Sequence, residues 1–391
     1  MGSELARYWT LDRETDFLNH GSFGACPLPV LEKQSELRAR LERQPVQFFR
    51  DLEGLLDDAR AALGVFVGAD GDDLAFVPNA TIGVNTVVRS LELSPGDELL
   101  TTDHAYNSCR NALRWHERAG VKIVLARVPW PLLGPWQVVE AVLSAVTPRT
   151  RFVVLDHITS PTALVFPVAE LVQKLQERDI ETMIDGAHAP GMVPPDLRAL
   201  GAAYYTGNCH KWLCAPKGAA FLHVRRDRQE LVKPIAHGHG LNSPRTDRSP
   251  FRLQMDWIGT DDPTAYLCVA TAVEFLGSLL PGGWAELMER NHRLAVRART
   301  LLCQALRAEP PAPAFMLGSM AAVPLPDYRG EAQPGSEAWW HPLQKQLLQK
   351  HRIEVPVMVF PALPRQLIRV SAQIYNSEEQ YARLAAALQV A

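Results

Sequence analysis

The chain has 391 residues, a formal net charge of −3, 47% hydrophobic residues and 21% charged residues. This balance is ordinary for a globular protein with a large core, and the length allows two domains. The charge gives no basic surface for nucleic acid, no apolar run approaches the roughly 20 residues of a membrane helix, and the polar stretch 1–13 has no apolar signal core. We therefore expect a cytoplasmic protein that binds neither nucleic acids nor membranes.

Six cysteines are spread along the chain, and none of them forms a Cys-x-x-Cys pair. His210 stands between Cys209 and Cys214, but this spacing does not complete a set of metal ligands. We expect reduced thiols and no metal site, and we interpret the alternating His and Gly residues at 237–240 as a glycine-rich loop.

Short apolar runs alternate with stretches of helical periodicity over residues 17–225. After a glycine-punctuated loop at 17–24, Pro27 opens a long helical region that reaches about residue 63. The continuous apolar run at 151–155 is typical of a strand that is buried on both faces. This alternation predicts an α/β fold with a mostly parallel sheet and helices on both of its faces. The further predicted strands are 73–77, 97–101, 121–127, 182–184 and 218–225, and the further predicted helices begin near residues 80, 108 and 167.

Polar side chains follow several of these strands at the point where each strand ends. Ligands of such sheets gather beyond the carboxyl ends of the strands, so we expect these side chains to surround one site. They are Thr81, His104, Ser160, Asp185 and His188.

The start of the helix near residue 80 is a candidate anion site. Ala80 and Thr81 lie where a strand turns into a helix, and the free N–H groups and dipole of a helix start favour a negative charge. Asn79 or Thr81 is alternatively an N-cap. The two interpretations are compatible, because a cap position is also a site for anions.

The last third of the chain predicts helices at 263–280 and 284–308, followed by a proline-rich stretch that introduces a smaller domain. The elements predicted there are strands at 315–325 and 366–371, a helix at 342–351, and a final helix that starts with a capping box of Ser377 and Gln380. We therefore predict a large domain at 15–262 and a small α+β domain with an interdomain helix at 263–391, which includes residues 1–14.

Asp185 and Lys211 point to a specific chemistry. Asp185 ends a buried strand, and Lys211 follows 26 residues later within a run of aromatic and small residues. A lysine can condense with the aldehyde of pyridoxal phosphate (PLP), and a carboxylate can keep the pyridine nitrogen protonated so that the ring accepts electrons. Taken singly, each residue also fits an ordinary role, as a solvated lysine and as an Asp-Gly turn.

Four motifs resemble those of a known family. They are LNHGSFG at 18–24, DGAH at 185–188, TGNCHKW at 206–212 and IRVSAQIYN at 368–376. These residues look like those of the isopenicillin N epimerases, which belong to the class V, fold-type I PLP enzymes together with the cysteine desulfurases. The resemblance covers nearly the whole chain. It implies a large PLP-binding domain with a seven-stranded type of sheet, and a homodimer with shared active sites.

The resemblance assigns roles position by position. Lys211 would form the Schiff base with PLP, Asp185 would pair with the pyridine nitrogen, and His104 would stack on the ring, a role for which Tyr106 is the alternative. Arg369 would bind the α-carboxylate of an amino acid substrate, with its planar guanidinium matching the carboxylate. The other cofactor-binding residues would be Ala80, Thr81, Ser160, His188, Asn208 and His210, with Thr260 reaching the phosphate of the neighbouring subunit, and Asn19, His20 and Tyr106 would border the substrate.

The expected activity starts with removal of the α-proton by Lys211. Reprotonation on the opposite face gives an epimerase, loss of a β-substituent gives a C–S lyase, and protonation at the cofactor gives an aminotransferase. The second acid of an epimerase would be Tyr106, His104 or a bound water. Cysteine desulfurases use a cysteine in the small domain, and residues 310–391 contain none, so persulfide chemistry is disfavoured. A PLP-binding sensor without catalysis is the remaining alternative.

Overall fold

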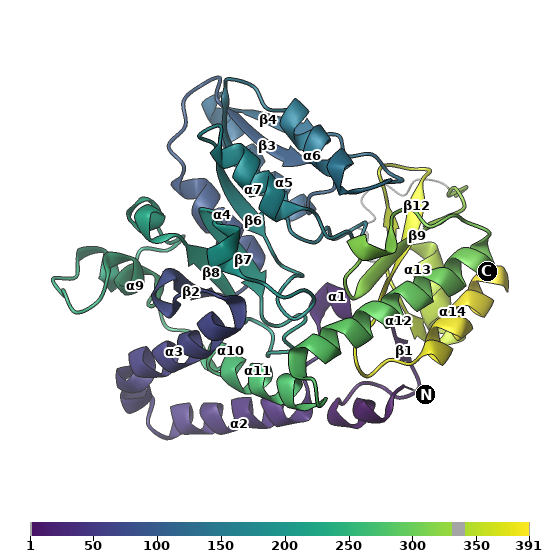
Figure 1. Ribbon diagram of the computed structural model, residues 1–391. Coiled ribbons are helices and arrows are strands. Elements are labelled where there is room, and N and C mark those ends of the chain that lie inside the picture. Colours follow the sequence, from purple (N-terminus) through teal and green to yellow (C-terminus); the bar gives the residue numbers. More distant parts are fainter. Residues whose placement is uncertain (1, 331–340, 391) are drawn as a thin grey trace.

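The computed structural model describes residues 2–330 and 341–390, and it has a seven-stranded sheet at its centre (Figure 1). The strand order is β2-β8-β7-β6-β5-β3-β4, and β8 runs antiparallel to both of its neighbours while β7, β6, β5, β3 and β4 are parallel. The predicted α/β class and mostly parallel sheet are confirmed. The strands are β2 (Leu74–Val77), β3 (Glu98–Thr102), β4 (Lys122–Ala126), β5 (Thr150–Asp156), β6 (Glu181–Asp185), β7 (Tyr204–Asn208) and β8 (Ala220–Val224).

Helices cover both faces of this sheet, and that explains why most residues of its strands are buried. In β5, Phe152 and Val154 pack into one hydrophobic cluster, whereas Val153 and Leu155 pack into another on the opposite face. Successive side chains of a strand point to opposite faces, so a continuous apolar run is required where both faces are covered. The strand β7 was not predicted, because its Tyr-Tyr-Thr-Gly-Asn sequence carries few branched apolar residues.

The predicted helix from Pro27 to about residue 63 is divided into two. The first part ends before Gln44, whose φ of −148° and ψ of 74° are not helical. Proline disfavours a helical residue before it, and Pro45 begins the second part. The helices of this part of the chain are α1 (His20–Phe23), α2 (Leu28–Arg43), α3 (Pro45–Val67), α4 (Ala80–Ser90), α5 (Asn107–Arg114), α6 (Pro135–Ser144), α7 (Val168–Gln176), α8 (Leu197–Leu200) and α9 (Pro250–Met255).

The C-terminal part forms a small antiparallel sheet with the order β11-β12-β9, flanked by helices (Figure 1). The predicted helix and second strand of this part coincide with α13 and β12, and Gln380 accepts the N–H of Ser377 at 3.0 Å as the capping box requires. The division into two domains remains a prediction. The elements are α10 (Thr264–Leu267), α11 (Val269–Ser278), α12 (Gly283–Leu306), β9 (Met320–Leu325), α13 (Pro342–His351), β11 (Val357–Val359), β12 (Gln366–Ser371) and α14 (Glu378–Val390), with a parallel pair of β1 (Asp16–Phe17) and β10 (Ile353–Glu354).

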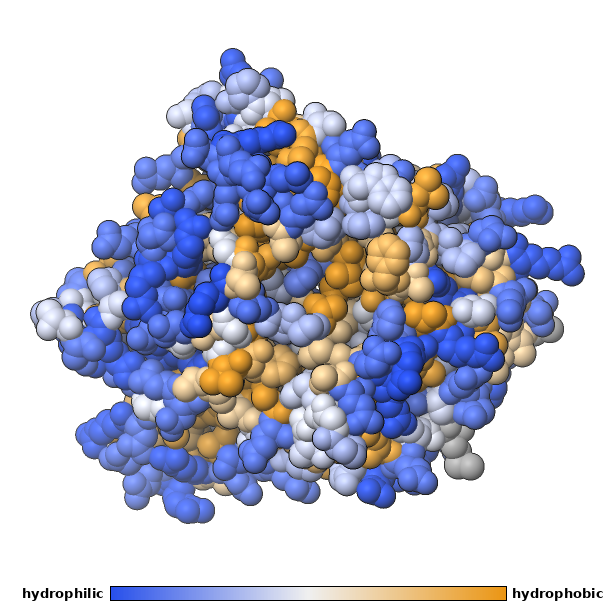
Figure 2. All heavy atoms as spheres, viewed as in Figure 1, coloured by the Kyte–Doolittle hydropathy of each residue, from blue (hydrophilic) through white to orange (hydrophobic). Residues whose placement is uncertain are grey.

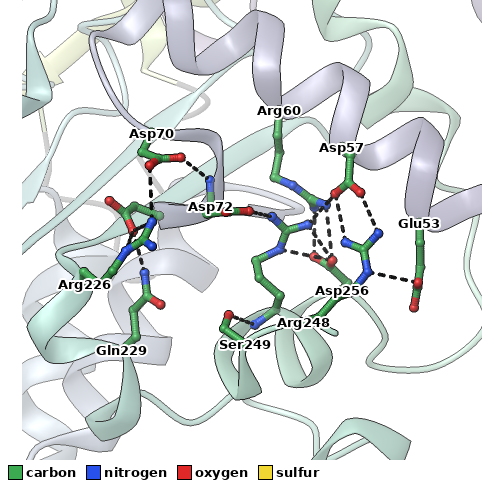
Figure 3. A network of polar contacts seen from close by, with 12 residues as sticks. Glu53, Asp57, Arg60, Asp70, Asp72, Arg226, Gln229, Arg248, Ser249 and Asp256 are labelled. Carbon is green, nitrogen blue, oxygen red and sulfur yellow. Dashed lines mark hydrogen bonds and ion pairs between the residues drawn. The ribbon is translucent and has the colours of Figure 1, made fainter. Parts of the chain in front are cut away.

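A buried ion network fixes the loop that leads to Thr260 (Figure 3). Asp256 begins this loop directly after α9, and its carboxylate accepts hydrogen bonds from Arg60 of α3 at 2.9 Å and from Arg252 of α9 at 2.8 Å. Both arginines also contact Asp57 of α3. Buried ion pairs require such multiple partners, because an unpaired charge is costly inside a protein. The network therefore anchors one end of the loop to α3.

The visible face of the molecule is mostly hydrophilic, with apolar residues gathered toward the middle of the view (Figure 2). Within the described part of the chain, no single helix is long and apolar enough to cross a membrane. One pair, Thr264–Ser278 with Gly283–Leu306, meets the length and composition criteria together, but it is bent by 73°.

Candidate active site

A cavity of about 1110 Å³ lies beyond the carboxyl ends of β5, β6 and β7. Its walls come from three parts of the chain: the strand ends of the central sheet, the segment containing α1, and the small C-terminal sheet with α13. Its lining includes Asn19, Ser22, Thr81, Tyr106, Asp156, Ser160, Asp185, His188, Asn208, His210, Lys211, Lys345, Glu354 and Arg369.

Lys211 lies three residues after β7, and its amine faces a histidine rather than a carboxylate. Its Nζ is 3.2 Å from Nε2 of His188. Burial lowers the pKa of Lys211 to about 7, and repulsion by Arg369 acts in the same direction, whereas Asp185 and Cys109 oppose the shift. A substantial share of Lys211 is therefore a neutral, nucleophilic amine near pH 7.

We expect the acetylation of Lys211 to follow this lowered pKa. Trace acetylation by acetic anhydride reacts with the neutral amine, so its rate at Lys211 should rise through pH 7 and level off by about pH 9, whereas an ordinary lysine titrates near 10.4. Peptide mass spectrometry of the full-length, cofactor-free protein measures this profile. The same lysine in urea-unfolded protein is the control, and identical profiles in folded and unfolded protein would contradict the burial effect.

Asp185 is held at the end of β6 by two donors. Its Oδ1 accepts the N–H of Ala187 at 3.0 Å, and its Oδ2 accepts the thiol of Cys109 at 3.0 Å. Asp156 stands opposite it in register on β5. Burial raises the pKa of Asp156 well above its usual range, and the nearby Asp185 adds to this shift. The pair can thus hold one negative charge facing a cationic ring nitrogen.

The start of α4 forms another end of the cavity. Asn79 caps this helix by accepting the N–H of Ile82 at 2.9 Å, which confirms the capping interpretation. Asn208 Oδ1 accepts the N–H of Ala80 at 2.9 Å, and the hydroxyl of Thr81 lies on the cavity wall. His210 joins this wall, with its Nδ1 2.8 Å from the carbonyl of Ala219. The start of this helix, with Thr81 on the cavity wall, fits a phosphate group.

Arg369 of β12 is a buried cation. It is 1% exposed, and its guanidinium donates to the carbonyl of Ser160 at 2.6 Å, to the Ser160 hydroxyl at 3.2 Å and to the Ser22 hydroxyl at 3.1 Å. Within residues 2–330 and 341–390 it forms no ion pair, and its Nε has no hydrogen-bond partner. Burial lowers its pKa to about 10. Such a site fits an incoming carboxylate.

The structure contradicts the stacking role of His104. This residue is fully buried and does not line the cavity; its Nδ1 is 2.8 Å from the Thr162 hydroxyl, and its ring packs 4.6 Å from that of Phe360. The chain turns after β3, which directs His104 away from the cavity. Tyr106, two residues later, is on the cavity wall.

The expectation that His20 borders the substrate is also contradicted. His20 is fully buried, with Nδ1 2.8 Å from the Tyr375 hydroxyl and Nε2 3.0 Å from the carbonyl of Lys211. The helical turn of α1 directs His20 inward, while its neighbour Asn19 lines the cavity. Thr260 is exposed and is not part of this cavity wall, so its contact with a neighbouring subunit remains a prediction.

Sequence reasoning missed several residues of the site. Asp156 could have been predicted from the sequence, because it is a polar residue that directly follows the predicted strand 151–155. Cys109, Ser22 and Glu354 gave no such signal, since each lies in a segment that folds against the site from elsewhere in the chain. Ser160, which was expected to bind the cofactor, does line the cavity. Its side chain and carbonyl both accept hydrogen bonds from Arg369, so it lies at the Arg369 end of the cavity.

Residues 27–384 match the aminotransferase class-V family. The chain is 36% identical to isopenicillin N epimerase of Amycolatopsis lactamdurans, over 97% of this chain and 96% of that protein. It is 29% identical to a probable chloroplastic L-cysteine desulfhydrase of Arabidopsis thaliana, over 94% of this chain and 81% of that protein. A solved variant of C-DES, with glycine covalently linked to its PLP cofactor, superimposes with a TM-score of 0.81 at 20% identity over 98% of both chains, which shows a shared fold.

Proposed function

Because the chain belongs to the aminotransferase class V family, we propose that it is a PLP-dependent epimerase that acts at the α-carbon of an amino acid. One observation carries this proposal: a buried lysine, a strand-end carboxylate and a buried arginine that forms no ion pair with any described residue line the same cavity. The isopenicillin N epimerase relative favours epimerisation over the other reactions that these groups support.

The side chains of the cavity fit PLP. Thr81, Asn208 and His210 would hold the phosphate at the start of α4, and Asp185 would face the pyridine nitrogen. His188 supports this placement, because its buried Nδ1 has no hydrogen-bond partner in the described part of the chain. When bound, PLP would accept the electron pair that removal of the α-proton leaves behind.

Lys211 and Arg369 would divide the work on the substrate. Arg369 would bind the α-carboxylate and so orient the α-carbon, while the neutral amine of Lys211 would take the α-proton. The lowered pKa of Lys211, near 7, suits a general base that works at neutral pH.

Tyr106 would be the second acid. It lines the same cavity as Lys211 and Arg369. His104 no longer competes for this role, because it is buried away from the cavity.

A C–S lyase is the second candidate, since the chain also resembles L-cysteine desulfhydrases over most of its length. Such an enzyme would share Lys211, Asp185 and Arg369 and would need no second acid. We further propose that the protein is a cytoplasmic homodimer in which Thr260 of each subunit completes the phosphate site of the other, consistent with its exposed position.

The test is a panel of L-amino acids, cysteine, cystine and a penicillin with an aminoadipoyl side chain, given to PLP-loaded protein. Deuterium uptake at the α-carbon and pyruvate release are followed together. Exchange with inversion and no pyruvate supports the epimerase, and Tyr106→Phe should then retain exchange while losing inversion. Pyruvate from cysteine or cystine would replace the epimerase by the lyase, and an absence of both signals would contradict both proposals.

A further inference from the structure

His20 lies directly behind the lysine of the site. Its Nε2 is 3.0 Å from the carbonyl oxygen of Lys211, and its ring packs on Trp212 with the ring centroids 4.8 Å apart. A carbonyl can only accept a hydrogen bond, so Nε2 carries the proton. Nδ1 is then the acceptor, and it receives the Tyr375 hydroxyl at 2.8 Å. Burial lowers the pKa of His20 to about 3, so the ring is neutral and this tautomer is fixed.

The same short helix also contacts the strand that carries Arg369. The N–H of Gly21 donates to the hydroxyl of Ser371 at 3.0 Å, and the hydroxyl of Ser22 accepts from Arg369 at 3.1 Å. Ser371 ends β12, and its own N–H donates to the carbonyl of Leu18 at 2.9 Å. Three consecutive residues, 20–22, therefore contact the lysine, the strand and the arginine.

Close packing leaves this segment little freedom. Gly24 ends α1 with a φ of 70°, and a Cβ at this position would lie 2.1 Å from the carbonyl of His210. Only glycine accommodates both the left-handed conformation and this approach. Tyr375 and Gln373, which follow β12, close the other side, and the Gln373 amide is 3.4 Å from His20 Nε2.

We propose that His20 is a positioning residue, which holds the backbone of Lys211 and ties it to β12 so that the lysine amine and Arg369 stay in fixed relation. Lys211 and Arg369 approach one site from different sheets, and the α1 contacts join them. The functional meaning of this arrangement rests on the proposed function, in which these residues are the base and the carboxylate binder.

The inference is tested with His20→Phe, His20→Gln and Tyr375→Phe in the full-length protein. The ionisable groups that act on the Lys211 amine are, besides His20 itself, Arg369, Asp185, Cys109, His188 and His210. Without its backbone anchor the lysine moves relative to them and toward the cavity, so its acetylation midpoint in cofactor-free protein should rise by about one pH unit. In PLP-loaded protein kcat should fall about 10- to 100-fold with KM little changed, since small misplacements of a reacting group are this costly.

His20→Gln keeps an N–H donor near the position of Nε2. Its Lys211 midpoint and kcat should therefore stay closer to those of the wild type than the values of His20→Phe do. Tyr375→Phe keeps the ring and loses only the hydroxyl that donates to Nδ1 of His20. It therefore tests the positioning of His20 even where His20→Phe does not fold. Tyr381→Phe is the matched control, because this buried hydroxyl donates to the carbonyl of Ser371 at 2.7 Å and does not contact His20.

An unchanged Lys211 midpoint in His20→Phe and Tyr375→Phe, with only their melting temperatures lowered as in Tyr381→Phe, would overturn the inference. The acetylation profile needs no turnover. A protein that acts on no amino acid would thus refute the proposed function, while the labelling comparison would still decide the role of His20.

Discussion

Replacing Lys211 with alanine is expected to abolish exchange of the α-proton with solvent deuterium. The structure offers no second amine on the described cavity wall apart from Lys345 on α13. Loss of a general base alone lowers rates by about 10²- to 10⁴-fold, and the covalent attachment of the cofactor would be lost as well. NMR of the α-carbon measures the exchange, and intact mass after borohydride reduction measures covalent PLP.

Lys174→Ala is the control for this experiment. Lys174 lies on the surface of α7, where it forms an ion pair with Glu170, so the variant should keep full exchange and covalent cofactor. Exchange at the wild-type rate in Lys211→Ala would remove Lys211 from the mechanism. Another group would then have to remove the α-proton of a substrate bound near Asp185 and Arg369.

The sequence predicted the fold well wherever local pattern decides structure. The buried strand at 151–155, the helix start after Asn79 and the capping box at Ser377 all depend on residues close together in the chain, and the structure confirms each of them. The strand β7 was missed because its Tyr-Tyr-Thr-Gly-Asn sequence fits a strand only when both faces are covered.

The candidate site was predictable only in part, because a motif does not determine the direction in which each of its side chains points. His20 stands in one of the expected motifs and His104 follows a predicted strand, yet the first faces the backbone of Lys211 and the second packs against Phe360. A residue beyond a strand end can turn toward or away from the cavity, and packing of distant segments decides between them. Ser22 is the converse case, a residue of the site that no local pattern predicted. Its contact with Arg369 joins residues that are 347 positions apart.

Replacing Arg369 with lysine is expected to lower kcat/KM by at least about 30-fold, mainly through KM. The loss of a buried, hydrogen-bonded charge partner costs about 2–5 kcal/mol, and 1.4 kcal/mol corresponds to a factor of ten. Lysine keeps the charge, but it cannot match a carboxylate with two parallel N–H donors, nor can it replace the bonds to Ser160 and Ser22. Steady-state kinetics on the best substrate of the panel measures the change.

Comparing two substrates gives the most direct test, because the role proposed for Arg369 depends on one functional group of the substrate, its α-carboxylate. An amino acid amide lacks the α-carboxylate, so its kcat/KM should be low in the wild type and change little in Arg369→Lys. Arg299→Lys is the matched control: Arg299 is also buried, donates to the carbonyl of Ala312 at 2.6 Å, and lies on α12 outside the cavity wall. An equal loss for the acid and the amide would assign Arg369 to the packing of the small C-terminal sheet, since only carboxylate binding distinguishes the two substrates.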